Sequence, residues 1–468
     1  MTPGAKTLVA RLGVAALGVA IWFWPVPEGL TAPAWHLFAI FAATIASVIV
    51  GALPILTASV LAVGISVLSG ILTPAKAYAG FANGTILLIV VAFLVARAIV
   101  KCGLGQRLGH LVVRLFGRST LGLGYSIFLL DAVIAPAFPS DTARSGVLYP
   151  LALSLAEAGG SRPDEATRKK MGAYLIFCGM ATLSLSSALW LTAMAGNPLG
   201  AEIGKSLGFK VSFGSWLLAS SVPTLLALAL LPLLLYKVFP PEVKATPEAP
   251  AAARKALAEM GPLSAQEKIV AATFVAMVVL WGLAGTLKLD LTAVAFLGLG
   301  VLLASGVLTL KDIGQQGDVL ATFIWFAILY TLSGQLNALG FMGYLGQRLG
   351  AALGGLPWPA VYVILVLAYV VLHYLFVSQT AHVLALFGVF LGVGAQLHVP
   401  VPVLGFALLF STCYFSTITP QASSANLLAV GSGYLTQGEL YKLGTITTAF
   451  NILLLLLVGT PWLLFVAR

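Results

Sequence analysis

Long apolar runs constrain this chain more than any other feature of its sequence. A helix needs about 20 apolar residues to cross the hydrocarbon core of a bilayer. Eleven runs approach this length, near residues 10–26, 34–52, 55–72, 84–100, 171–199, 214–236, 268–286, 290–308, 319–338, 403–435 and 444–466. Because 60% of the residues are apolar and only 9% are charged, a soluble globular fold is excluded. The sequence predicts an all-α polytopic membrane protein.

Two further apolar runs, 121–138 and 357–377, each end at a polar break. The breaks read Ser140-Asp141-Thr142-Ala143-Arg144 and, 238 residues later, Ser378-Gln379-Thr380-Ala381-His382. Polar backbone at membrane depth is tolerated only where it lines a cavity or is buried in protein. We therefore expect two re-entrant hairpins, at about 121–158 and 357–396, in addition to the eleven spans.

Other segments also recur in the same order. Residues 104–109 recur as 345–350, and Ser187-Ala188 recurs as Ser424-Ala425. Three ordered matches indicate a duplication. The predicted organisation is an N-terminal span (1–33), a first repeat (34–239), a cytoplasmic linker (240–266) and a second repeat (267–468).

The basic residues indicate orientation rather than nucleic-acid binding. The net charge is +10, but the basic residues lie in loops between spans. With a cytoplasmic N-terminus, 18 of the 25 Lys and Arg residues fall inside and 6 outside, and Arg144 lies in the first hairpin. This bias predicts a multi-pass protein of the inner (plasma) membrane. It also predicts repeats of opposite orientation, an arrangement typical of secondary transporters. A cleaved signal peptide is the less favoured interpretation of the N-terminus, because Trp22-Phe23-Trp24 resembles an interfacial anchor.

The two hairpin tips are the candidate substrate site. A helix that begins at membrane depth presents free N–H groups and the positive end of its dipole. Two such tips suit a substrate with two carboxylates. The candidate binding residues are Ser140, Asp141, Thr142, Ser378, Gln379 and Thr380. The alternative is that Ser and Thr only cap the helices.

Arg144 and His382 occupy the same position after the two tips and are candidate counter-charges for an anion. The alternatives are a local pair between Arg144 and Asp141 and a neutral packing role for His382. Hydroxyl and amide groups that interrupt the following spans are candidates for lining the pocket, unless they only bond back to their own helices. They are Thr182, Ser186, Ser187 and Asn197 in the first half, and Thr419, Ser423 and Ser424 as the counterparts in the second. Asp131 and His373 are weaker candidates.

The sequence offers no competing enzyme site. It has no Walker A loop, no dinucleotide fingerprint and no His/Cys cluster with metal spacing. Cys102, Cys178 and Cys413 lie far apart and are interpreted as packing residues. We therefore expect no cofactor and no metal. A channel or receptor remains the alternative of a different class, although it would not need two broken hairpins.

At the paired tips the chain resembles the divalent anion:sodium symporter (DASS) family. The likeness is greatest to its 2-oxoglutarate/malate translocators and citrate/succinate-type exchangers. Further matching segments are 191–198 and 431–434. The family's tips read Ser-Asn-Thr, so Ser140, Thr142, Ser378 and Thr380 match and inherit a carboxylate-binding role. Asp141 departs from the pattern and puts an acidic group beside the expected anion, unless Arg144 pairs with it.

The resemblance implies a homodimer that works by an elevator mechanism in the lipid bilayer. It also implies a sodium-independent exchanger of dicarboxylates of the 2-oxoglutarate/malate/succinate class, in which Arg144 and His382 replace the family's sodium ions. The alternative is a sodium-coupled symporter of di- or tricarboxylates. The sequence leaves the individual substrate, the coupling ion and the direction of flux open.

Overall fold

The computed structural model describes residues 3–467, and this part of the chain is helical apart from one isolated β-bridge between Ser119 and Ala245. It divides into two compact units. Unit 1 comprises the chain up to Val90 together with Pro198–Lys210 and Gln316–Leu409, and unit 2 comprises Val91–Asn197, Val211–Gln315 and the chain from Phe410. Each unit therefore draws on both halves of the sequence.

The number of membrane-crossing helices agrees with the sequence prediction. Within the described residues, ten helical segments are long and apolar enough to span a bilayer. Three of them are the hairpin arms Thr120–Ala137, Trp358–Leu375 and Gln379–Gln396. The other seven, together with the four shorter apolar helices Thr7–Phe23, Ile55–Leu68, Leu291–Ala304 and Val401–Thr417, lie at the positions of the eleven predicted spans.

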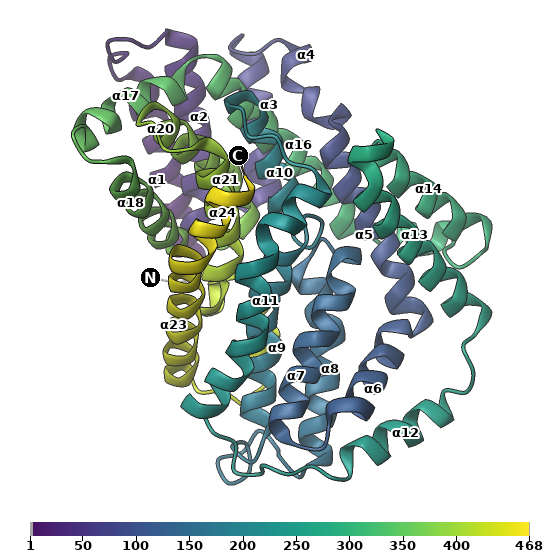
Figure 1. Cartoon of the computed structure of the whole chain (residues 1–468). Helices are drawn as coiled ribbons and strands as arrows, with labels where there is room; N and C mark the ends of the chain where they lie inside the picture. Colours follow the sequence, from purple (N-terminus) through teal and green to yellow (C-terminus); the bar gives the residue numbers. More distant parts are fainter. Residues whose placement is uncertain (1–2, 468) are drawn as a thin grey trace. The chain divides into compact units, whose positions relative to one another are not determined.

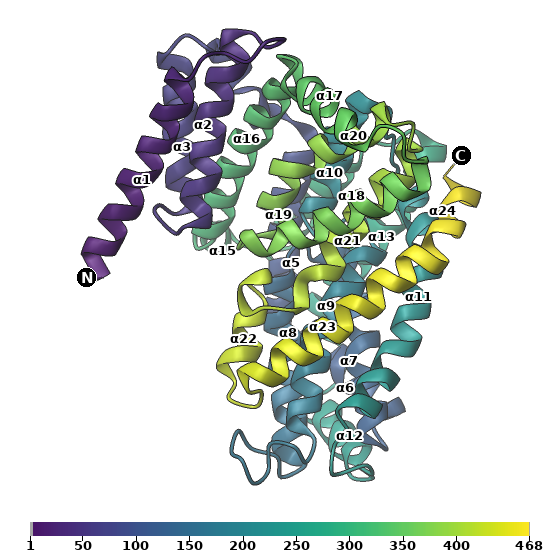
Figure 2. The same cartoon turned by 90° about the vertical axis from the view of Figure 1, so that its left-hand side faces the viewer.

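Unit 1 contains the first three helices and the second hairpin. Its helices are α1 (Pro3–Phe23), α2 (Ala32–Ile49), α3 (Ile55–Leu68), α4 (Pro74–Ala77), α16 (Gly317–Ala338), α17 (Phe341–Leu353), α18 (Trp358–Leu372), α19 (Gln379–His382) and α20 (Gly388–Gln396). A π-helical turn, Val383–Phe387, joins α19 to α20. Helices α1, α2, α3 and α16 lie side by side (Figure 2).

Unit 2 contains the first hairpin and the spans that follow both hairpins. Its helices are α6 (Leu104–Phe116), α7 (Thr120–Ile134), α8 (Asp141–Ala158), α9 (Gly172–Leu189), α11 (Phe213–Val238), α12 (Ala249–Glu259), α13 (Ala265–Leu287), α14 (Leu291–Ala304), α15 (Leu310–Gly314), α22 (Asn426–Gly431), α23 (Gln437–Leu454) and α24 (Thr460–Val466). Helix α9 packs against α7, α8 and α11 (Figure 1). Helices α5 (Gly84–Cys102), α10 (Gly196–Gly204) and α21 (Val401–Tyr414) contribute residues to both units.

The segment 240–266, which the sequence predicts to be a linker, is partly helical. It contains α12, which packs on α6. The Arg107 side chain of α6 bonds to Glu267 at 2.5 Å and donates to the Gly261 carbonyl at 2.9 Å. Because Arg107 is only 8% exposed, this ion pair anchors the end of the segment to unit 2.

The two hairpins have matched element bounds. The first arms end at Ile134 (α7) and Leu372 (α18), which are 238 residues apart. The second arms begin at Asp141 (α8) and Gln379 (α19), which are also 238 residues apart. Short 3₁₀ turns, Ala135–Ala137 and His373–Leu375, follow the first arms at the same spacing. The duplication read from the sequence is thus matched by the secondary structure of the hairpins.

Candidate functional site

The first tip forms because a proline turn ends α7 and a serine starts α8. Pro136 lies in the turn Ala135–Ala137, where its missing N–H and fixed φ cannot continue the helix. Ser140 is extended (φ −143°, ψ 120°), and its hydroxyl accepts a hydrogen bond from the Ala143 N–H. This is an N-cap, so the backbone enters α8 with its first N–H groups at the tip.

Arg144, one turn into α8, is fully buried and surrounded by oxygen atoms. Its Nε lies 3.0 Å from Asp131 Oδ1, and its Nη2 donates to Asp141 Oδ1 at 2.9 Å and to Ser187 Oγ at 2.5 Å. The same guanidinium donates to main-chain carbonyls of Phe138, Leu183 and Ala193. The pairing with Asp141, which the sequence left open, is present in the structure. Both terminal nitrogens therefore donate hydrogen bonds to protein oxygens, while Nε has only its ion-pair contact with Asp131 within the described residues.

The two carboxylates around Arg144 are themselves held by hydroxyls of α9. Ser186 donates a short hydrogen bond to Asp131, and Ser187 donates to Asp141 Oδ1 at 2.7 Å. Asp131 and Arg144 are 0% exposed, and Asp141 is 7% exposed. With both carboxylates ionised, the Asp131–Arg144–Asp141 cluster carries one net negative charge. Such a buried cluster is stable only while its charges stay paired and hydrogen-bonded.

The break after α9 is tied to the hairpin turn. Thr192 Oγ1 donates to the Pro136 carbonyl at 2.8 Å, and the Ala195 N–H donates to the Pro139 carbonyl at 3.1 Å. Asn197 Nδ2 donates to the carbonyls of Ser187 (2.8 Å) and Trp190 (3.3 Å), where α9 ends. These bonds satisfy backbone acceptors that the broken helix leaves free.

The second half contains the same asparagine bridge, and it corrects one sequence match. Asn426 Nδ2 donates to the carbonyls of Ser416 (2.7 Å) and Thr419 (3.0 Å), at the same spacings of ten and seven residues. The counterpart of Ser187 is therefore Ser416, 229 residues later, and the pairing of Ser187 with Ser424 was wrong. The reason is a shorter loop after the second hairpin, which occupies only 397–400 where the first half has 159–171.

Replacing either bridging asparagine by alanine should destabilise unit 2 by about 1–3 kcal/mol, because two buried carbonyls lose their donor. Unfolding of purified Asn197→Ala and Asn426→Ala in detergent measures the loss. Asn337→Ala is the matched control, since within the described residues the Asn337 side chain makes one exposed bond, to Ser206 at 3.3 Å. A loss in the control as large as in the two variants would contradict the bridging role.

Unit 2 brings the first tip together with the second break. Thr142 Oγ1 and Ser424 Oγ share a hydrogen bond at 2.7 Å, and both residues are exposed. Ser145 of α8 donates to the Ala425 carbonyl at 3.4 Å. Ser140 and Thr419 are half-buried, and Ser423 is 4% exposed. Thr142, Gln421 and Ser424 are exposed here and Ser140 is half-buried, whereas the hydroxyl of Thr419 is buried.

The other pocket-lining candidates lie deeper than the sequence suggested. Thr182, Ser186, Ser187 and Asn197 are all 0% exposed. Ser186 and Ser187 donate hydrogen bonds to the aspartates of the Arg144 cluster, and Asn197 donates to a carbonyl at the end of α9. These three side chains therefore do not point into an open pocket. Asn426 was absent from the candidates, although its position ten residues after Ser416 repeats that of Asn197 after Ser187 and was available as a signal.

The second tip lies in unit 1 and repeats the first in its backbone. Ser378 is extended (φ −136°, ψ 124°), and its hydroxyl accepts a hydrogen bond from the Ala381 N–H at 3.3 Å. Gln379 and Thr380 are buried, at 7% and 8% exposed. Both tips therefore present the same capped helix start, although the helix after the second tip is interrupted by the π-helical turn.

The residue at the position of Arg144 in the second tip, His382, contacts aromatic rings. His382 is fully buried, and its ring lies 4.2 Å from the ring of Tyr369 and 5.3 Å from that of His373. Tyr369 stands 238 residues after Asp131, so Arg144 and His382 each contact the same position of their own first arm. The ion pair of the first hairpin thus corresponds to a ring contact in the second.

Comparisons with known proteins agree with one another. A family model described as the sodium:sulfate symporter transmembrane region matches residues 5–467. The Bacillus subtilis protein YflS, whose name describes it as a candidate malate transporter, is 39% identical and covers 98% of this chain and 96% of its own. The chloroplastic dicarboxylate transporter 1 of Arabidopsis thaliana is 38% identical, over 98% of this chain and 83% of that one.

A solved structure shares the fold of the whole chain. The crystal structure of the YdaH transporter of Alcanivorax borkumensis matches with a TM-score of 0.59 at 16% identity. The match covers 98% of this chain and 97% of that one.

Proposed function

The chain belongs to the family of the sodium:sulfate symporter transmembrane region, the divalent anion:sodium symporters, and we propose that this membrane transporter exchanges dicarboxylates without sodium. The proposed substrates are of the 2-oxoglutarate/malate/succinate class. Two relatives that align over nearly the whole chain are named for malate or dicarboxylate transport, which supports this class.

The proposed binding elements are the two capped tips. Ser140 and Thr142 at one tip, and Ser378 and Thr380 at the other, offer hydroxyl groups beside free N–H groups of a helix start. Such groups suit a carboxylate. Asp141 and Gln379 lie at the centre of each tip, and Ser424 adds a hydroxyl bound to Thr142.

The observation that carries sodium independence is the oxygen cage around Arg144. Two carboxylates, one hydroxyl and three carbonyls surround the guanidinium. Carbonyls of broken helices and nearby carboxylates are the ligands that transporters of this kind use for Na⁺. In this chain a covalently attached cation occupies such an oxygen set, so the first tip needs no ion from solution to hold it together. His382 takes the corresponding position at the second tip.

The competing function is sodium-coupled symport of di- or tricarboxylates, which the description of the family favours. The remaining proposals concern the whole assembly. Family membership supports a homodimer that works by an elevator mechanism, with inverted repeats. The distribution of Lys and Arg supports an inner-membrane location with a cytoplasmic N-terminus, and the 31%-identical Escherichia coli relative YbhI is named an inner membrane protein.

Transport in proteoliposomes tests the proposal. Vesicles are loaded with unlabelled malate or 2-oxoglutarate, and uptake of labelled dicarboxylate is followed with sodium or choline outside. We expect uptake that requires internal substrate and is the same in both salts. Sodium-dependent uptake into empty vesicles would instead establish symport. Uptake that needs neither internal substrate nor sodium would favour a channel, and no uptake under any condition would contradict the substrate class.

A further inference from the structure

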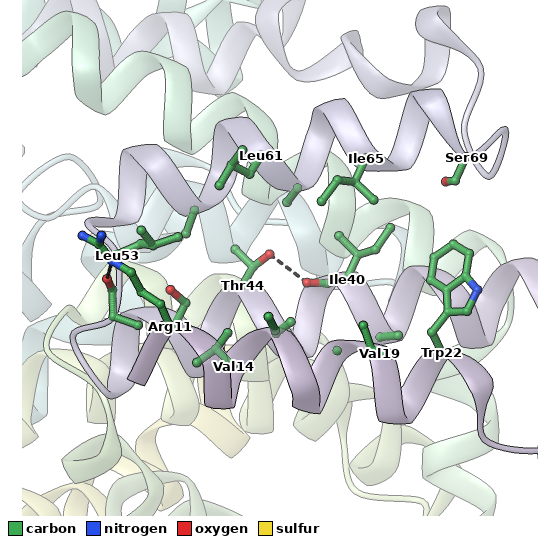
Figure 3. A pocket seen from close by; sticks show the side chains of 18 of the residues that line it. Arg11, Val14, Val19, Trp22, Ile40, Thr44, Leu53, Leu61, Ile65 and Ser69 are labelled. Carbon is green, nitrogen blue, oxygen red and sulfur yellow. Dashed lines mark hydrogen bonds between the residues drawn. The ribbon is translucent and has the colours of Figure 1, made fainter. Parts of the chain in front are cut away.

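An apolar cavity of about 580 Å³ lies between α1, α2 and α3 of unit 1 (Figure 3). Its walls include Val14 and Val19 of α1, Ile40 of α2, and Leu61 and Ile65 of α3. The hydroxyl of Thr44 in its wall already donates to the Ile40 carbonyl at 2.7 Å. Ser47 and Ser69 add two more hydroxyls, of which that of Ser47 is buried without a hydrogen-bond partner within the described residues, and most of the remaining lining is apolar. Such a lining suits an apolar occupant better than water.

Small side chains explain why the three helices leave this space. Ala15 and Gly18 of α1 face the cavity, as do Ala43 of α2 and Ala58 and Ala62 of α3. Helices α1 and α2 pack closely, and at one of their contacts a Cβ on Gly18 would lie 3.1 Å from the Cβ of Ala43. Beyond this contact the alanines are too short to fill the gap between the helices. If the gap stayed empty, the side chains that line it would lack van der Waals contacts on one side, which would destabilise the packing of the three helices.

The two ends of the cavity differ in chemistry. Arg11 lies at one end and Trp22 at the other (Figure 3). Arg11 is exposed and uses its Nε to donate to the Ala52 carbonyl at 3.1 Å, while its two terminal nitrogens make no hydrogen bond within the described residues. Trp22 is stacked on His36, with ring centroids 4.2 Å apart. Eleven helical residues separate Arg11 from Trp22, which corresponds to about 16 Å along the axis.

We propose that this cavity binds one acyl chain of an anionic phospholipid, with the phosphate of the headgroup on Arg11. The bilayer supplies apolar chains that can fill the elongated space. The free face of the Arg11 guanidinium suits a phosphate oxygen pair and selects an anionic headgroup over a zwitterionic one. The apolar walls exclude a dicarboxylate, so this site is independent of the proposed substrate site.

The test uses the full-length protein in vesicles or nanodiscs of defined lipid. Retention of phosphatidylglycerol and of phosphatidylcholine is measured by native mass spectrometry after release. We expect the wild type to retain phosphatidylglycerol preferentially, and Arg11→Gln to reduce this retention about fivefold and that of phosphatidylcholine by less, because the choline cation already opposes Arg11. Arg162→Gln, which removes a solvent-exposed arginine of the 159–171 loop, is the matched control and should change neither.

Filling the cavity tests the acyl chain separately. Ala62→Phe and, as a second variant, Ala15→Leu place bulk in the space, so they should lower retention of both lipids. Thermal unfolding in detergent is the folding control, and lipid retention is compared only for variants whose unfolding temperature matches that of the wild type. Unchanged lipid retention in the folded filling variants, or equal loss in Arg11→Gln and Arg162→Gln, would overturn the proposal.

Discussion

Replacing Arg144 by methionine is expected to cost about 3–5 kcal/mol of stability and to abolish transport. The change leaves Asp131 and Asp141 buried without their cation, and removing one partner of a buried ion pair typically has this cost. It also removes the donor to the carbonyls of Phe138 and Ala193, which join the tip to the loop after α9. Unfolding in detergent measures the stability, and exchange in proteoliposomes measures the activity.

A triple variant separates the two effects. Asp131→Asn, Asp141→Asn and Arg144→Met together remove every charge of the cluster, and a neutral replacement of a buried triad is often as stable as the original. We expect it to recover most of the lost stability but not exchange, since no cation then occupies the tip. Arg107→Met is the matched control, because Arg107 is also buried and paired, with Glu267. Arg107→Met should lower the free energy of unfolding by about as much as Arg144→Met does, but the folded Arg107→Met protein should keep the substrate affinity of the wild type. Full exchange by the triple variant would show that Arg144 has only a structural role.

The sequence predicted the hairpins well because their signals are local. A short 3₁₀ turn, a capping serine and the end of an apolar run each act within a few residues, and they recur after 238 residues, although only the first turn contains a proline. The same holds for the eleven spans, because hydropathy is summed over one helix at a time.

The surroundings of the cluster could not be predicted, because they depend on contacts between distant segments. Asp131 was only a weak candidate, since its pairing with Arg144 arises when α7 and α8 fold back on each other. The match of Ser187 with Ser424 failed for a related reason. The loop after the second hairpin is shorter, so residue identity alone selected the wrong serine, whereas the contacts of Asn426 select Ser416.

Replacing Asp141 by asparagine is expected to strengthen dicarboxylate binding roughly 30- to 150-fold. If both aspartates are ionised, the cluster at the first tip then loses its net negative charge, and asparagine restores the Ser-Asn-Thr pattern of the family that the chain resembles at its tips. A unit charge about 6 Å from a carboxylate costs about 2–3 kcal/mol at an effective dielectric constant of about 20, which corresponds to this factor. The amide oxygen can still accept the hydrogen bonds that Ser187 and Arg144 make to Asp141 Oδ1. Calorimetry on the purified protein measures the dissociation constant.

The second tip supplies the converse experiment. Gln379 stands at the position equivalent to Asp141, so Gln379→Glu adds the charge that Asp141→Asn removes. It should weaken dicarboxylate binding by at least tenfold, provided that the substrate binds at this tip. Because the two substitutions change charge in opposite directions at matched positions, opposite changes in affinity would locate a carboxylate near each tip. If both variants bind as the wild type does, the tips do not hold the substrate, and the exposed hydroxyl groups of Thr142 and Ser424 have another role.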